Sequence, residues 1–104
     1  MTVPLQGEIW WVETPDARRP VLVVTRTEAI PVLTWIVVAA VTSTIRGIPT
    51  EVAVGSGEGL DREPVANFDD LRAVRRSACT TRVGSLDAAR RHEVCAPLRA
   101  LTDC

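Results

Sequence analysis

The sequence contains no lysine, no tyrosine and a single histidine, and these scarcities narrow the chemistry open to the chain. All 12 basic residues are arginines, and a GC-rich genome would produce the same bias. The planar guanidinium can nevertheless bind phosphate through two hydrogen bonds at once. His92 has no recognisable partner for a Ser-His-Asp or Cys-His set, so we predict that it lies at the surface. An enzyme of this composition must rely on Arg, Ser/Thr and Asp/Glu, which suit charge stabilisation at a phosphodiester.

The three cysteines, Cys79, Cys95 and Cys104, are odd in number and form no Cys-x-x-Cys pair. We therefore expect neither a disulfide framework nor a zinc site, and a reducing cytoplasm as the compartment. Asp69 and Asp70 are adjacent, and neighbours on a strand point to opposite faces. We interpret them as solvated carboxylates, and we expect no metal and no cofactor.

A length of 104 residues predicts one domain spanning residues 1–104. The net charge of −1 gives no bulk electrostatic reason to bind nucleic acid. The start of the chain has no secretory signal pattern. The most apolar window, residues 29–41, is interrupted by Pro31 and Thr34 and is shorter than the roughly 17 residues of a membrane helix. We expect a cytoplasmic protein with no membrane segment.

Short apolar and alternating runs predict a mainly β fold with a helix at the C-terminus. Ser85 or Asp87 is expected to cap that helix, and Pro97 to kink or shorten it. Val94, Leu98 and Leu101 would share one face of it. Strands are predicted at residues 8–13, 21–24, 34–42, 50–54, 64–74 and 82–84, with turns at 14–17 and 46–49, a turn or helical connection at 77–81, and a flexible glycine-rich loop at 55–59. This pattern indicates a small antiparallel barrel or twisted sheet.

The stretch from Arg18 to Arg26 looks like the element around which the chain is organised. Pro20 fixes its own φ and holds Arg19 in an extended conformation. Residues 21–24 are apolar without alternation, which predicts burial on both faces. A guanidinium held at the entrance of a buried strand suits anion binding, although Arg-Pro can equally begin a strand whose arginine is merely solvated.

Two further features are open to a structural or a functional interpretation. Trp10 and Trp11 place one indole on each face of the first strand, one in the core and the other available to a partner or a base. The central strand ends in hydroxyls, Thr42 to Thr44. They can serve a site or bond to their own backbone.

Several motifs in the same order resemble the MazF/PemK toxins of type II toxin–antitoxin systems. They are Gly7-Glu8-Ile9-Trp10, Arg19-Pro20-Val21-Leu22-Val23-Val24, Ala39-Ala40-Val41-Thr42, Arg46-Gly47-Ile48-Pro49-Thr50-Glu51-Val52, Val65-Ala66-Asn67-Phe68-Asp69-Asp70-Leu71-Arg72-Ala73-Val74 and Arg82-Val83-Gly84-Ser85-Leu86. The resemblance extends from about Gly7 to the end of the chain.

The resemblance implies a small SH3-like antiparallel barrel with a C-terminal helix, working as a homodimer. It implies a metal-independent, sequence-specific endoribonuclease that cuts single-stranded RNA to 2′,3′-cyclic phosphate and 5′-hydroxyl ends. The catalytic positions of the family match Arg19 and Thr42. A MazE-like antitoxin with a disordered acidic tail would occupy the RNA groove and contact Trp10 or Trp11 and nearby arginines. Candidate RNA-binding residues are Arg18, Ser43, Arg46, Trp10 and Asp16.

The segment from Glu13 to Arg18 is shorter than the glycine-containing loop, with its acidic residue, that often precedes the Arg-Pro of the family. Glu13 and Asp16 are the nearest acids that could assist Arg19. Two alternatives remain at this stage. One is a CcdB-like gyrase-binding toxin, although the chain ends Leu101-Thr102-Asp103-Cys104 and not in Trp-Gly-Ile. The other is a non-catalytic SH3-like interaction module.

Overall fold

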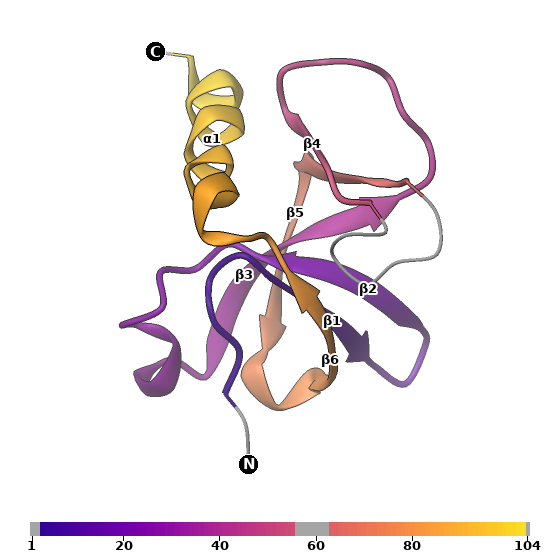
Figure 1. The fold of residues 1–104 in the computed structure, drawn as a ribbon. Helices are drawn as coiled ribbons and strands as arrows, with labels where there is room; N and C mark the ends of the chain where they lie inside the picture. The colour runs from indigo at the N-terminus through magenta and orange to yellow at the C-terminus, as the bar shows by residue number, and fades with distance from the viewer. Residues whose placement is uncertain (1–2, 56–62, 104) are drawn as a thin grey trace.

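The computed structural model describes residues 3–55 and 63–103. Within them, six strands form one antiparallel sheet in the order β4-β5-β3-β2-β1-β6 (Figure 1). The strands are β1 (Glu8–Glu13), β2 (Arg18–Val23), β3 (Trp35–Thr42), β4 (Glu51–Ala53), β5 (Val65–Arg75) and β6 (Cys79–Ser85). The predicted mainly β class is therefore confirmed, and the strands on either side of the predicted turn at 14–17 pair as an antiparallel hairpin. Most of the predicted loop at 55–59 lies outside the described residues.

The sheet is buried on both of its faces, as the unbroken apolar run of β2 predicts. Leu22 and Val24 belong to one core cluster, together with Phe68 and Ala39. Val21 and Val23 belong to a second cluster on the opposite face, which also contains the following residues of other elements: Trp10, Val12, Ile30, Ile36 and Val38. Side chains alternate between the two faces along a strand. The side chains of β2 and β3 that lie on the same face as the second cluster therefore also line the candidate site.

The C-terminal segment is helical but is not one continuous α-helix. Asp87 caps a 3-10 helix, η4 (Ala88–Val94), by accepting a hydrogen bond from the Arg90 backbone N–H. The α-helix α1 (Cys95–Thr102) follows directly. Pro97 lies in the first turn of α1, where a missing N–H leaves no hydrogen bond unmade. The proline is thus compatible with the start of the α-helix, and of the predicted kink or shortening the structure shows a short α-helix that begins two residues before Pro97.

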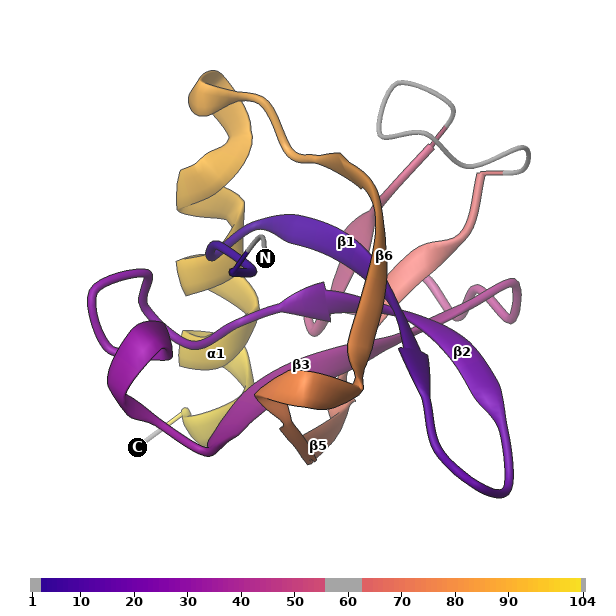
Figure 2. The same ribbon diagram turned by 90° about the horizontal axis from the view of Figure 1, so that it is seen from below.

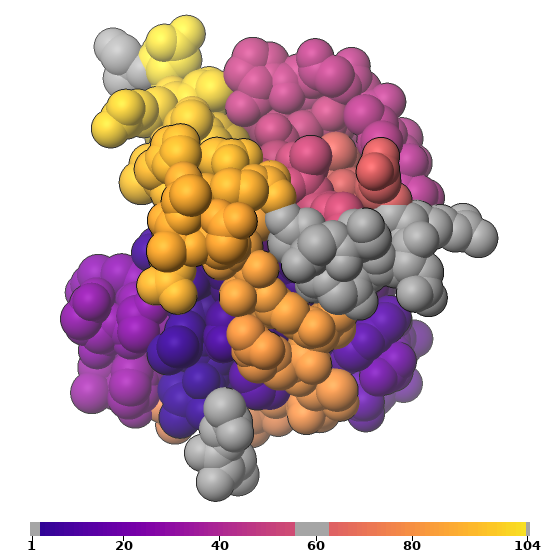
Figure 3. Space-filling view, viewed as in Figure 1, coloured from indigo at the N-terminus to yellow at the C-terminus, as the bar shows by residue number. Residues whose placement is uncertain are grey.

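One face of this segment covers the first core cluster. Val94 is buried and Leu98 packs against the cluster, but Leu101 is exposed, so only part of the predicted apolar face is used. The Arg90 guanidinium donates to the Ala53 carbonyl, which ties η4 to β4. Figure 3 shows the yellow and orange C-terminal segment beside the magenta segment that leads into β4.

The strand β6 begins three residues earlier than the sequence predicts. A 3-10 turn, η3 (Arg76–Ala78), ends β5, and the chain then pairs with β1 from Cys79 onward. The Thr80 hydroxyl donates to the Glu13 carboxylate across this pair at 3.1 Å. Residues 79–81 are therefore strand and not a turn, because their pairing with β1 outweighs the weak strand propensity of this short polar segment. Figure 2 shows β6 running beside β1 at the end of the sheet.

Another 3-10 turn, η1 (Ile30–Val32), contains Pro31 and lies in the connection between β2 and β3. Over the residues that the structure describes, no helix is long and apolar enough to cross a membrane.

Candidate active site

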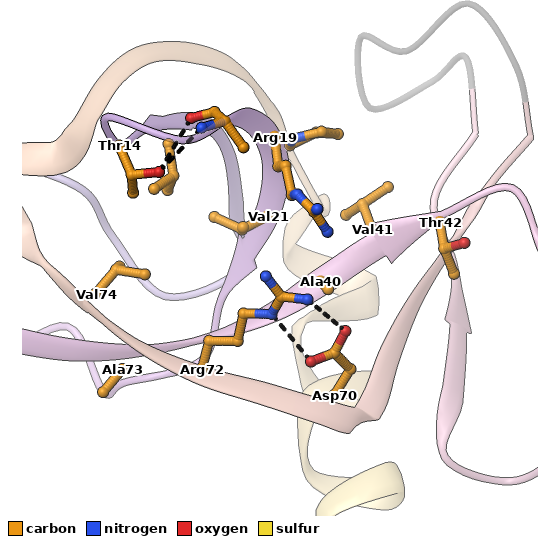
Figure 4. Close-up of a pocket in the computed structure, with 13 residues that line it drawn as sticks. Thr14, Arg19, Val21, Ala40, Val41, Thr42, Asp70, Arg72, Ala73 and Val74 are labelled. Carbon is orange, nitrogen blue, oxygen red and sulfur yellow. Dashed lines mark hydrogen bonds and ion pairs between the residues drawn. The ribbon is translucent and has the colours of Figure 1, made fainter.

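A cavity of about 370 Å³ lies between the β1–β2 hairpin and the strands β3 and β5 (Figure 4). It is on the sheet face that holds the second core cluster, since Val12, Val21 and Val74 form its apolar floor. The polar and charged side chains at its border are Thr14, Arg19, Thr42, Asp70 and Arg72.

Strand alternation and register bring Arg19 and Thr42 to this cavity. On β2, Arg19 shares a face with Val21 and Val23; on β3, Thr42 shares a face with Val38. The two strands pair Val21 with Ala40, and the same register carried two residues further sets Arg19 opposite Thr42. Both residues line the cavity, so the structure brings together the two residues predicted to be catalytic.

The Thr42 hydroxyl also has a local role. Its oxygen accepts a hydrogen bond from the Thr44 backbone N–H at 3.1 Å. This is the backbone-bonded arrangement that the sequence left open as the structural alternative, and it fixes the side chain at the mouth of the cavity. A hydroxyl that accepts one hydrogen bond can still donate its own hydrogen, so the two interpretations are compatible.

Asp70 and Arg72 complete the polar border, and sequence reasoning missed both. Arg72 Nε and Nη2 donate to the two carboxylate oxygens of Asp70, each at 3.0 Å. This hydrogen bond lowers the pKa of Asp70, an effect opposed by partial burial and supported by the charges of Arg72 and Arg19. The same pairing raises the pKa of Arg72. Asp70 is therefore solvated as predicted, with a side chain that is 41% exposed, but it also forms an ion pair that the sequence did not predict.

Its neighbour Asp69 points elsewhere, accepting a hydrogen bond from the Thr50 hydroxyl. The opposite orientations of the two carboxylates agree with the sequence argument. The spacing of Asp70 and Arg72 was a signal that could have identified the pair, because residues i and i+2 of a strand share a face. The sequence did not reveal that this face is the one with the cavity.

Arg18 lies on the other side of β2 from Arg19 and is outside the cavity lining. Its Nε donates to Glu13 at 3.1 Å, and its guanidinium lies 4.0 Å from the centre of the Trp11 ring. Glu13 is thus engaged by Arg18 and Thr80. The exposed Asp16 lies in the β1–β2 turn, and neither acid reaches the cavity that holds Arg19.

The other predicted RNA contacts also lie outside the cavity. Ser43 follows Thr42 and is exposed, and Arg46 is exposed in the β3–β4 connection, where its backbone N–H donates to the Glu51 carboxylate. Trp10 is only 4% exposed, and its Nε1 donates to Glu8 at 3.0 Å. A buried indole cannot stack on a base, so the contact predicted for Trp10 is wrong; Trp11 is the partly exposed member of the pair.

A second hollow of about 340 Å³ adjoins the cavity along β5, and the two share Thr14, Ala73 and Val74 in their linings. Trp35 and Arg75 are among the residues that border it. Together the two hollows form an elongated depression, a shape that suits a chain-like ligand better than a single small molecule.

In the described part of the chain, no group of three or more His, Cys, Asp or Glu residues is arranged to hold a metal ion. The donors at the border of the cavity include the guanidinium groups of Arg19 and Arg72 and the Thr42 hydroxyl, which are groups that suit an anion site.

Comparisons with known proteins show the family to which the chain belongs. The family model described as PemK-like, MazF-like toxin of type II toxin–antitoxin system matches residues 5–102. A Mycobacterium tuberculosis protein named "Probable endoribonuclease MazF2" is 39% identical over 100 residues, covering 95% of this chain and 98% of that protein.

Two solved structures share the fold. The Mycobacterium tuberculosis toxin MazF-mt6 superposes with a TM-score of 0.85 at 30% identity, covering 92% of this chain and 96% of that one. A MazE–MazF structure from Deinococcus radiodurans superposes with a TM-score of 0.79 at 25% identity, covering 98% and 97%. The chain belongs to the PemK-like, MazF-like toxins of type II toxin–antitoxin systems.

Proposed function

We propose that this chain is an endoribonuclease that cuts single-stranded RNA at a short sequence without a metal ion, and that Arg19 and Thr42 act on the scissile phosphate. The observation that carries the proposal is the placement of these two side chains, from neighbouring strands, in one cavity that also holds Arg72. The endoribonuclease name of the 39% identical relative supports the same activity.

In the proposed reaction, the 2′-hydroxyl of a ribose attacks the adjacent phosphate. The 2′-O–P bond forms while the P–O5′ bond breaks, leaving a 2′,3′-cyclic phosphate and a 5′-hydroxyl. The 2′ proton is lost to solvent, and the leaving 5′-oxygen gains a proton. Negative charge grows on the non-bridging oxygens, where the Arg19 guanidinium and the Thr42 hydroxyl would donate hydrogen bonds. Arg19 is chiefly a stabiliser, because a guanidinium rarely releases a proton.

Residues outside the cavity would hold the flanking RNA. Arg18 and Arg46 are proposed to contact the phosphate backbone, with Ser43 and Asp16 at the borders of the groove. Such contacts supply affinity, while bases in the adjoining hollow supply sequence preference. The elongated shape formed by the two hollows supports binding of more than one nucleotide.

The proposal includes the assembly. The protein would act in the cytoplasm as a homodimer and be neutralised by a MazE-like antitoxin whose acidic tail competes with RNA for the arginines. The MazE–MazF structure from Deinococcus radiodurans, which covers 98% of this chain, supports the antitoxin partner. A disordered tail that folds on binding can cover a groove of this length.

The test is cleavage of a long single-stranded RNA in EDTA, followed by mapping of the ends. Wild type is expected to cut at one short sequence and leave cyclic phosphates. Arg19→Ala should lower kcat/KM by about 10²–10³-fold, the usual loss when one charge-stabilising donor is removed. Thr42→Ala should lower it by about 10–150-fold, as for one hydrogen bond to a charged group.

An Arg99→Ala variant provides the charge control, because Arg99 is exposed on α1 and lies outside the cavity lining. Intact RNA in the presence of folded wild type would overturn the proposed activity. Equal cleavage by wild type and both site variants would leave the activity in place and overturn the site assignment.

A further inference from the structure

We propose that the negative charge of Asp70 makes the cavity bind an internal phosphodiester in preference to a terminal phosphomonoester. We also propose that Arg72 is the second phosphate-binding guanidinium. The inference rests on the proposed RNA-cleaving function of the same cavity and adds the charge state of its preferred ligand. It assigns roles to two residues that sequence reasoning did not place in the site.

The charges at the cavity are the first argument. Of the described residues that line it, Arg19 and Arg72 are positive and Asp70 is negative, which leaves one net positive charge. An internal phosphodiester carries one negative charge, whereas a phosphomonoester carries about −1.5 to −2 near pH 7. The cavity therefore neutralises a diester but leaves a monoester with unmatched charge.

The geometry of the pair is the second argument. The two 3.0 Å hydrogen bonds occupy Nε and Nη2 of Arg72, and a guanidinium has five N–H donors in all. Donors on Nη1 thus remain for a ligand while Asp70 holds the side chain in place. Figure 4 shows the Arg72 guanidinium lying between Asp70 and Arg19, so both guanidinium groups border the same space.

Asp70 itself is poorly suited to receive the 2′ proton. Its hydrogen bonds to Arg72 lower its pKa, which weakens it as a base. The pair is also about half exposed, with side-chain exposures of 43% for Arg72 and 41% for Asp70. An exposed ion pair adds little stability, so a role in shaping the electrostatics of the cavity explains the pair better than a role in folding.

The test compares two uncleavable probes at pH 8 by equilibrium titration: adenosine 3′-monophosphate and a 2′-O-methyl dinucleotide with one phosphodiester. Asp70→Asn keeps the shape of the side chain and raises the net charge of the cavity by one. One added charge near a monoanion in water-like surroundings corresponds to about a fivefold gain in affinity, and near a dianion to about 25-fold. The preference for the diester should therefore fall by about fivefold.

Asp103→Asn makes the same charge change at the exposed end of α1, outside the cavity, and should leave the affinities for both probes unchanged. Arg72→Ala should weaken both probes at least tenfold while keeping the thermal unfolding temperature near that of wild type. Circular dichroism of each variant checks the fold.

Equal changes for the two probes in Asp70→Asn, or the same shift in Asp103→Asn, would overturn the role of Asp70. Unchanged binding in Arg72→Ala would overturn the role of Arg72, and failure of wild type to bind either probe would overturn the anion site altogether. Because these titrations need no turnover, failure of the nuclease proposal would show separately, as intact RNA in the cleavage assay.

Discussion

Replacing Pro20 by alanine should extend the pairing of β2 with β3 beside the cavity. The Val23 carbonyl accepts from Gly7 on the β1 side, and the Val24 N–H donates to Val37 of β3. Since these directions alternate along a strand, the nitrogen of Pro20 faces β3. Proline has no N–H to donate, and the last β2–β3 pair is Val21 with Ala40.

In Pro20→Ala, the new amide at position 20 can donate to the Val41 carbonyl, which the register sets opposite it. One added hydrogen bond contributes about 0.5–1.5 kcal/mol. Loss of the proline's restriction on the unfolded chain costs about 0.4–1 kcal/mol. The two effects nearly cancel, so the free energy of unfolding should change by less than about 1 kcal/mol.

Activity should change far more than stability. A continued ladder would bring the Cα atoms of Arg19 and Thr42 to about 4.5–5.5 Å, the spacing of paired strands. A phosphate would then no longer fit between their side chains. Misplacement by about 1 Å can cost about 10²-fold in rate, and we expect a loss in kcat/KM of at least that size. Pro49→Ala, at an exposed loop proline, is the matched control.

The test combines amide hydrogen exchange of the Pro20→Ala variant with an RNA cleavage assay. Slow exchange at position 20 with weak cleavage is the expected result. Fast exchange at that amide together with wild-type cleavage would refute the idea that the proline holds the strands apart.

Three further predictions concern stability and reactivity. Burial alone would raise the pKa of Glu8, but hydrogen bonds from Arg82, Trp10 and the Leu5 N–H outweigh it and lower the pKa below 4.5. The ionised Glu8 carboxylate therefore stabilises the fold above pH 4.5, and this stabilisation is lost as the pH falls through the lowered pKa. Glu8→Gln should lower the free energy of unfolding in urea by about 1–3 kcal/mol at pH 7 and by less at pH 3. Equal losses at the two pH values would contradict this reasoning. Burial raises the pKa of Cys79 to about 11, whereas Cys95 is exposed, so iodoacetamide at pH 8 should label Cys95 before Cys79, as followed by mass spectrometry. Gly7 has a φ of +85°, so Gly7→Ala should destabilise the fold by about 1–2 kcal/mol in the same urea assay.

Local chemistry was sufficient to predict most of the strands, whereas the two principal candidate site residues depended on the family resemblance. The unbroken apolar run at 21–24 indicated burial on two faces, and the structure has all four residues buried. Arg19 and Thr42 were identified from the family resemblance and from their places at strand ends. Their proximity follows from the pairing of β2 with β3, a non-local relation that no local pattern encodes.

The sequence did not reveal an irregularity in the pairing of β5 that lies next to Asp70. Ala39 pairs with Leu71, whereas the next residue of β3, Ala40, pairs with Asn67. The intervening residues of β5 form a bulge, and a bulge changes which side chains face each side of a sheet. No glycine or proline marks it in the sequence. In the same way, the two-residue period could place the two indoles on opposite faces but could not tell which face the core covers at Trp10.

The proline and the bulge act on the same end of β3. On one side, β2 stops pairing after Ala40 because Pro20 cannot donate a hydrogen bond. On the other side, the register of β5 shifts between Ala39 and Ala40, next to Asp70, which lines the cavity together with Arg72. The cavity thus lies where two irregularities of the sheet coincide, and we expect that restoring regular pairing on either side would reduce RNA cleavage more than it alters stability.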